Sequence, residues 1–303
     1  MPESNTYSLT TYNKGAAVVG TLRYYLGEEV LYPALKAYVD SFAFRHATTD
    51  DFKNFIAGYS KRNLDDFFNL WVKQPGFPAF EIDSIVATPV DGGYKETIFL
   101  EQKRWHAPEY GRNVRVPITL FDKEGKVSEE VEAIVTGEKA YFLVQTTFEP
   151  AYGIVNKDNQ IAVASFTNRL QIDHTGNYPA PMGCLLDIEC KQQGEESTDI
   201  YVQHYWVAPD AMRSPAPVIL SDSHYWRIAG PIPASCQLTG KFHLDKEELD
   251  KNLLENDPDT ILLMYRPDPS AEWSEVSAAT VTKDHYITAD YLKSGEYCLA
   301  VPK

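Results

Sequence analysis

The spacing of hydrophobic residues predicts a helical segment in the first quarter of the chain. Residues 11–27 are nearly uncharged and carry apolar side chains on more than one face, unlike a surface helix with one polar half. Helical spacing continues in three further stretches, which contain Leu31, Leu35, Tyr38 and Phe42; Phe52, Phe55, Ile56 and Tyr59; and Leu64, Phe67, Phe68 and Trp71. Residues 48–51 predict an N-cap, and the prolines at 75 and 78 end the segment. We therefore expect antiparallel helices, the first of which lies deep inside a larger structure.

From Ala79 onward the pattern changes to the period of two that is typical of strands. Residues 94–100 follow a turn signal at 91–93, and apolar residues alternate within 114–120, 127–135 and 141–144. This spacing predicts an antiparallel sandwich, with 150–159 as its exit and 161–164 as the link to the next part. Further strands are expected at 184–190, 200–207, 225–228, 261–266 and 297–301, and one short helix at 246–254.

Together these patterns predict an α+β multidomain protein, in which an N-terminal antiparallel helical segment precedes two β-sandwich-like domains. We place the helical segment at 1–78, the β-sandwich domain at 79–165 and a β-rich C-terminal accessory domain at 166–303. The tripeptide His-Tyr-Trp occurs at 204–206 and again at 224–226. Two matches of three residues do not establish a repeat, and we interpret them as strand aromatics.

Charge and composition exclude several classes of function. A formal net charge of -15 over 303 residues argues against nucleic acid as a partner, because phosphates attract basic surfaces. No apolar run reaches membrane-spanning length, and residues 1–5 do not resemble a signal peptide, so the localisation stays undefined. The four cysteines, at 184, 190, 236 and 298, form no Cys-x-x-Cys pair. They are either two disulfides or four free core thiols.

The histidines provide no recognisable metal site. None of the seven stands four residues from another, so the zinc-binding helix motif His-Glu-x-x-His is absent from the sequence. A Gly-x-Ser-x-Gly nucleophile elbow, a phosphate loop and a dinucleotide fingerprint are absent as well. The residues by themselves therefore predict no complete active site.

The helical segment nevertheless resembles the M1 family of zinc aminopeptidases. The resemblance is carried by short motifs in a fixed order, namely Tyr12-Asn13-Lys14-Gly15-Ala16, Leu22-Arg23-x-x-Leu26-Gly27-Glu28-Glu29, Leu35-Lys36-Ala37-Tyr38-Val39, Thr48-Thr49-Asp50-Asp51-Phe52 and Phe67-Phe68-x-x-Trp71 followed by Pro75-Gly76-Phe77-Pro78. It implies that residues 1–78 are the helical end of a thermolysin-like catalytic domain. A β-sandwich follows these helices in that family, as the strand pattern also predicts here.

The resemblance implies a role for Tyr12, which stands in the motif Tyr-x-Lys-Gly. There its hydroxyl would stabilise the oxyanion that forms during peptide hydrolysis, and Tyr7 would line the same pocket. Without the motif, Tyr12 would be read as packing at the start of a helix. Zinc and a peptide substrate are expected in the intact enzyme. The zinc ligands and the glutamate that binds the substrate amine would lie upstream, so this chain would hold no metal or cofactor and be inactive alone.

A second interpretation is a non-catalytic binding or assembly module that has kept the family's folds. In both cases the first helix is expected to expose an apolar patch that includes parts of Val18, Val19, Leu22, Tyr24 and Tyr25. Such patches are uncommon on isolated domains. We therefore expect the chain to form a homo-oligomer through this helix.

Overall fold

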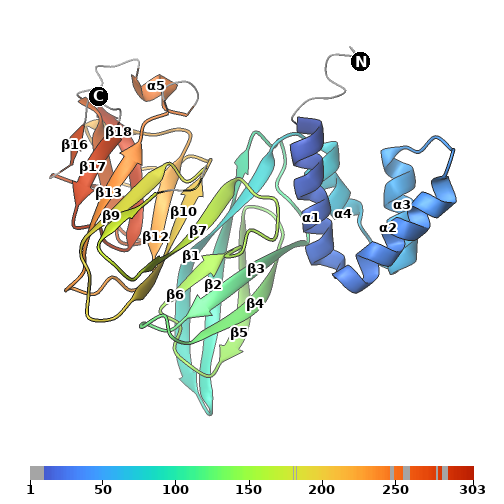
Figure 1. Ribbon diagram of the computed structural model, residues 1–303, viewed down its shortest axis with the longest axis horizontal. Helices are drawn as coiled ribbons and strands as arrows, with labels where there is room; N and C mark the ends of the chain where they lie inside the picture. The colour runs from blue at the N-terminus through green and yellow to red at the C-terminus, as the bar shows by residue number, and fades with distance from the viewer. Residues whose placement is uncertain are drawn as a thin grey trace.

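Helices come first in the fold and antiparallel sheets follow, so the predicted α+β class is confirmed (Figure 1). The computed structural model describes residues 10–303 except 180, 182, 246–248, 255–259, 278 and 282–285. Tyr7 lies outside the described residues, as does part of the helix expected at 246–254. Of that helix the structure has α5 (Lys251–Leu254).

The helical segment consists of η2 (Thr10–Lys14), α1 (Gly15–Leu26), α2 (Glu28–Phe42), α3 (Thr49–Ser60), α4 (Asp65–Phe68) and η3 (Asn69–Lys73), where η denotes a π-helical turn. Gly27 separates α1 from α2 with a φ of 83°, a backbone conformation that favours glycine. Thr48 caps α3 as predicted, since its hydroxyl accepts from the Asp51 N–H and its own N–H donates to the Asp51 carboxylate. Within the described residues, no helix is long and apolar enough to cross a membrane.

The first β region is a pair of three-stranded sheets. One contains β1 (Phe77–Val90), β2 (Gly93–Trp105) and β5 (Lys139–Thr146), and the other contains β4 (Ser128–Val135), β3 (Val114–Phe121) and β6 (Tyr152–Val155). The predicted turn at 91–93 joins β1 to β2. The expected exit at 150–159 instead contains β6, which pairs with β3. Gly153, Ile154 and Val155 are all buried, so no alternation marks this strand in the sequence.

The second β region has two larger sheets. Its strands are β7 (Ser165–Ile172), β8 (Gly176–Tyr178), β9 (Leu186–Gln192), β10 (Thr198–Tyr205), β11 (Val218–Leu220), β12 (Tyr225–Ala229), β13 (Gln237–His243), β14 (Leu262–Arg266), β15 (Ser274–Glu275), β16 (Thr280–Val281), β17 (Tyr286–Asp290) and β18 (Gly295–Pro302). One sheet has the order β15-β14-β18-β12-β10-β7 with β11 beside β18, and the other has the order β16-β17-β13-β9-β8. Ile188, Trp226, Phe242 and Leu299 belong to the core of this region. Its four cysteines are free thiols, the second of the two alternatives left open by the sequence.

The helical segment and the first β region share one hydrophobic core. Leu22 and Trp71 from the helices belong to the same buried cluster as Ile98 and Val116 from the sheets. Ala162 in the following link fixes this arrangement, because its carbonyl accepts from Trp71 Nε1 at 2.7 Å and its N–H donates to Thr21 Oγ1 at 2.8 Å. The helices are therefore attached to the sandwich by both packing and partly buried hydrogen bonds.

The strand β1 contributes alternate side chains to two different cores. Phe80 and Ile82 belong to the core shared with the helices. Ala79 instead packs in a separate cluster with Tyr205, Tyr225 and Met264 from the second β region. Glu81, two residues on, also reaches that region and accepts a hydrogen bond from Tyr225. One strand thus joins both β regions.

Replacing Trp71 with alanine tests the shared core. We expect Trp71→Ala to lower the free energy of unfolding by about 3–5 kcal/mol, because it leaves a cavity and removes the partner of the Ala162 carbonyl. Urea unfolding followed by circular dichroism measures the change. Val72→Ala, at the exposed neighbouring position, is the control and should change it by at most about 0.5 kcal/mol. Equal losses in the two variants would contradict the shared core.

Candidate functional site

The motif tyrosine lies at the start of the first helix. Tyr12 is in η2, and its side chain is 60% exposed. Two residues later, Lys14 Nζ donates to the carbonyl oxygens of Gln74 and Gly76, both at 3.3 Å, and lies 4.8 Å from the centroid of the Phe77 ring. Burial lowers the pKa of this lysine. The lysine of the motif therefore connects the start of α1 to the end of the helical segment, while Tyr12 stays exposed.

An apolar groove of about 600 Å³ adjoins this helix start. Its walls come from α1 on one side and from α3, α4 and η3 on the other, and include Val18, Phe52, Phe68 and Trp71. The exposed patch expected on α1 is smaller than predicted. Val19 is 41% exposed, but Leu22 and Tyr25 are buried against the shared core.

Within the part of the chain that the structure describes, one group of three carboxylates lies close enough together to hold a metal ion, and it does not fit zinc. Glu81, Glu101 and Asp210 each offer an oxygen within 4.8 Å of the others. Lys103 Nζ already lies 2.9 Å from Glu81 Oε1 and 2.7 Å from Asp210 Oδ1, in the place that a cation would need. The group also lacks the histidine or cysteine donors that zinc sites use. We therefore derive no chemistry through a metal at these residues.

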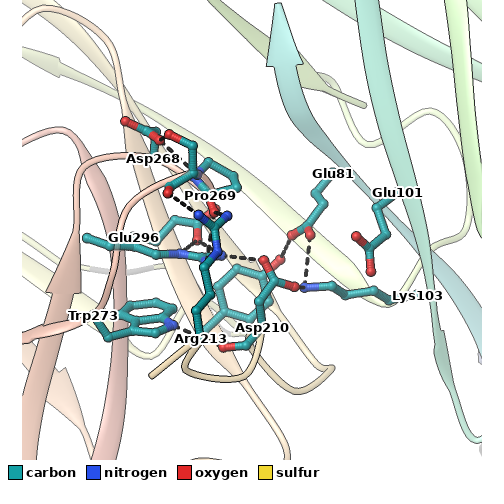
Figure 2. A network of polar contacts seen from close by, with 12 residues as sticks. Glu81, Glu101, Lys103, Asp210, Arg213, Asp268, Pro269, Trp273 and Glu296 are labelled. Carbon is teal, nitrogen blue, oxygen red and sulfur yellow. Dashed lines mark hydrogen bonds and ion pairs between the residues drawn. The ribbon is translucent and has the colours of Figure 1, made fainter. Parts of the chain in front are cut away.

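Lys103 instead belongs to a buried charge network between the two β regions (Figure 2). Asp210 accepts from Arg266 Nη2 at 2.7 Å, and Arg266 Nε donates to Glu296 at 2.6 Å. Trp273 covers the Arg266 guanidinium, with the ring centroid 4.5 Å away. The network thus links β1 and β2 to β14 and β18.

The environment of Asp210 shows how the network balances its charges. Burial alone would raise the pKa of this carboxyl, but Lys103 and then Arg266 hold it below its usual value. Glu296 is more deeply buried and lies near Glu81, and both effects raise its pKa. Lys103 and Arg266 therefore offset the desolvation cost of the acidic side chains in this interface.

The two His-Tyr-Trp tripeptides lie at the ends of the neighbouring strands β10 and β12, and Trp206 follows β10 while His224 precedes β12. Four of the six residues are thus strand aromatics, in agreement with the interpretation from the sequence. In β10 and β12, Tyr205 pairs with Tyr225 and the two rings stack at 4.7 Å. His204 and His224 point to the other side of the sheet, where His204 Nε2 and His224 Nδ1 lie 2.8 Å apart. The contact between His204 and His224 was not predicted from the sequence, in which the repeated tripeptide is the only feature that points to it.

Comparison with known proteins identifies the N-terminal segment. Residues 2–71 match the sequence profile of the peptidase family M1 domain. The segment that carries Tyr12 thus resembles the peptidase family M1 domain, which confirms the predicted resemblance. Aminopeptidase M1 of Arabidopsis thaliana is 32% identical over 117 residues, which cover 38% of this chain and 12% of that protein. Aminopeptidase N of Lactobacillus delbrueckii subsp. lactis is 29% identical over 124 residues, covering 40% and 14% respectively.

The matches span only 12% and 14% of the lengths of these two relatives. Among solved structures, Legionella pneumophila aminopeptidase A in complex with aspartic acid has a TM-score of 0.44 and 17% identity, covering 52% of this chain and 18% of that chain.

Removing Lys103 tests the charge network. Lys103→Met should lower the free energy of unfolding by about 3–5 kcal/mol, because Glu81 and Asp210 lose their buried counter-ion. Lys139→Met is the matched control, since Lys139 is exposed and lies 3.7 Å from Glu101, and it should cost at most about 1 kcal/mol. Chemical unfolding at pH 7 measures both. A Lys103 variant as stable as the control would show that the network does not support the interface.

Proposed function

We propose that this chain is part of an M1-family aminopeptidase that releases residues from peptide N-termini, and that the zinc ligands of that enzyme lie outside the 303 residues. The family match over residues 2–71 carries the proposal. The absence of His-Glu-x-x-His from the sequence and the poor fit of the carboxylate group to zinc support the second part. By itself the chain is then inactive.

Tyr12 is the catalytic residue of this proposal. A phenol hydroxyl is a hydrogen-bond donor and can stabilise a developing oxyanion. The contacts of Lys14 with the end of the helical segment support this role, because they hold the helix start in place while the Tyr12 side chain stays exposed. In this proposal the helical segment 1–78 closes the catalytic domain, and the regions 79–165 and 166–303 support it.

An assembly module derived from the same family is the second candidate. The exposed groove between α1 and η3 favours it, because apolar surface of this kind is typical of interaction sites. The full reading frame distinguishes the two candidates. A His-Glu-x-x-His motif encoded upstream of Met1 supports the enzyme, and a native start at Met1 supports the module.

Activity of the purified chain is the first test. Incubated with Zn²⁺ and a panel of aminoacyl-4-nitroanilides, the chain should release no nitroaniline above the buffer rate. Metal analysis of the same sample should find less than stoichiometric zinc. Turnover together with stoichiometric zinc would contradict the proposal.

Tyr12→Phe tests the catalytic role in an enzyme that contains both this sequence and a zinc site. We expect kcat to fall about 10²–10³-fold with little change in KM, because one oxyanion donor is lost. Tyr32→Phe, at an exposed position of α2, should leave both constants unchanged. Equal kinetics of the two variants would remove Tyr12 from the mechanism.

We also propose that the purified chain self-associates through the exposed side of α1. Light scattering over a range of concentrations should show a mass that rises with concentration, and Val19→Glu should shift it toward the monomer. Val86→Glu, at an exposed position in β1, is the control for added charge alone. A strict monomer at all concentrations would contradict self-association.

A further inference from the structure

A continuous chain of hydrogen bonds runs through the interior of the second β region. It connects the carbonyl oxygen of Gly183 to His204 Nδ1 at 2.6 Å, His204 Nε2 to His224 Nδ1 at 2.8 Å, and His224 Nε2 to Asp250 Oδ1 at 2.8 Å. The side chains of His224 and Asp250 are fully buried, and so is His204. These hydrogen bonds join β10 to the residue before β12 and to the turn before α5.

The two ends of this chain can only accept hydrogen bonds. A backbone carbonyl has no proton, and an ionised carboxylate has none either. Each of the three contacts needs one hydrogen, so the chain needs three protons. Two neutral imidazoles supply two, one on each ring. With two protons, one contact would place two lone pairs opposite each other at 2.6 or 2.8 Å.

We infer that the folded protein holds a third proton at this site at neutral pH, which makes His224 an imidazolium between the Asp250 carboxylate and a neutral His204. His224 Nε2–H then donates to Asp250, and His224 Nδ1–H donates to His204 Nε2. His204 Nδ1–H donates to the Gly183 carbonyl. All three contacts become ordinary hydrogen bonds, and the buried pair of His224 and Asp250 carries no net charge.

The surroundings are consistent with this distribution of protons. Burial, followed by the neighbouring His224, lowers the pKa of His204 well below its usual value, which places the extra proton away from His204. The second oxygen of Asp250 accepts from the Asp245 N–H at 2.7 Å, so the carboxylate is held by a donor on each side. Two further titratable residues adjoin this site, namely Asp245, whose N–H contacts Asp250, and Cys184, which follows Gly183 in the loop before β9. Burial raises the pKa of the Cys184 thiol to about 12. It is therefore neutral at physiological pH, and Asp250 is the counter-ion of His224.

The inferred proton makes the second β region sensitive to pH. Histidine in an unfolded chain has a pKa of about 6.5, so the unfolded protein does not bind this proton at pH 8. Folding then takes up one proton. The contribution of this proton to the free energy of unfolding is fully present below about pH 6.5. It is lost as the pH rises through the alkaline range. Because unfolding then releases one proton, the equilibrium constant of unfolding rises up to tenfold for each increase of one pH unit.

Nitrogen NMR of the histidine rings is the direct test. In ¹⁵N-histidine-labelled protein at pH 7, both ring nitrogens of His224 should resonate as protonated nitrogens, and His204 should show one protonated and one unprotonated nitrogen. His224→Gln and His204→Gln assign the signals. An unprotonated nitrogen on both buried rings in the folded protein would overturn the inference, because His224 would then not be an imidazolium.

Unfolding as a function of pH gives an independent measure of the same proton. Between pH 7 and 8.5 the wild-type unfolding constant should rise with pH, and Asp250→Asn should flatten that rise. Asp187→Asn is the matched control, since Asp187 pairs with the less buried His243 at 2.9 Å, and it should retain the wild-type slope. A wild-type slope near zero would contradict the inference. If Asp250→Asn does not fold, the wild-type slope and the NMR spectra decide the question alone.

Discussion

The desolvation of charged side chains constrains how the two β regions meet. Lys103 and Arg266 lie in an interface from which water is largely excluded, and each must keep its carboxylate partners within hydrogen-bond distance. Apolar packing around Ala79 and Met264 tolerates small shifts, whereas an unpaired buried charge does not. The ion network therefore constrains the orientation of the second β region on the first, and the apolar cluster packs beside it.

The helical segment depends on the same scaffold in a different way. Leu22 and Trp71 complete a core that the first β region begins, so the helices and the sandwich are one packing unit. The match to the peptidase family M1 domain ends at residue 71, within this packing unit. The position of the motif that contains Tyr12 is thus set by the shared hydrophobic core, which extends well beyond residue 71.

Local patterns in the sequence predicted the helices, caps and turns whose defining contacts lie between residues close in sequence. The helical stripes, the Thr48 cap and the turn at 91–93 were all visible because periodicity and turn chemistry are local signals. The strand β6 was missed, since most of its residues are buried and do not alternate. The motif pointed to Tyr12, but no local signal relates Lys103 to Asp210 or His224 to Asp250, because those contacts exist only after folding.

The alternation along β1 has a consequence for sequence change. Phe80 and Ile82 face one core while Ala79 and Glu81 face the other, so a shift by one residue would exchange the two sets. An insertion or deletion before Ile82 would bury Glu81 among aliphatic side chains and point Phe80 at Lys103. Substitutions that preserve polarity can accumulate in this part of the strand, but insertions and deletions before Ile82 cannot. The spacing of residues 79–82 is therefore expected to be the most constant property of this region among related chains.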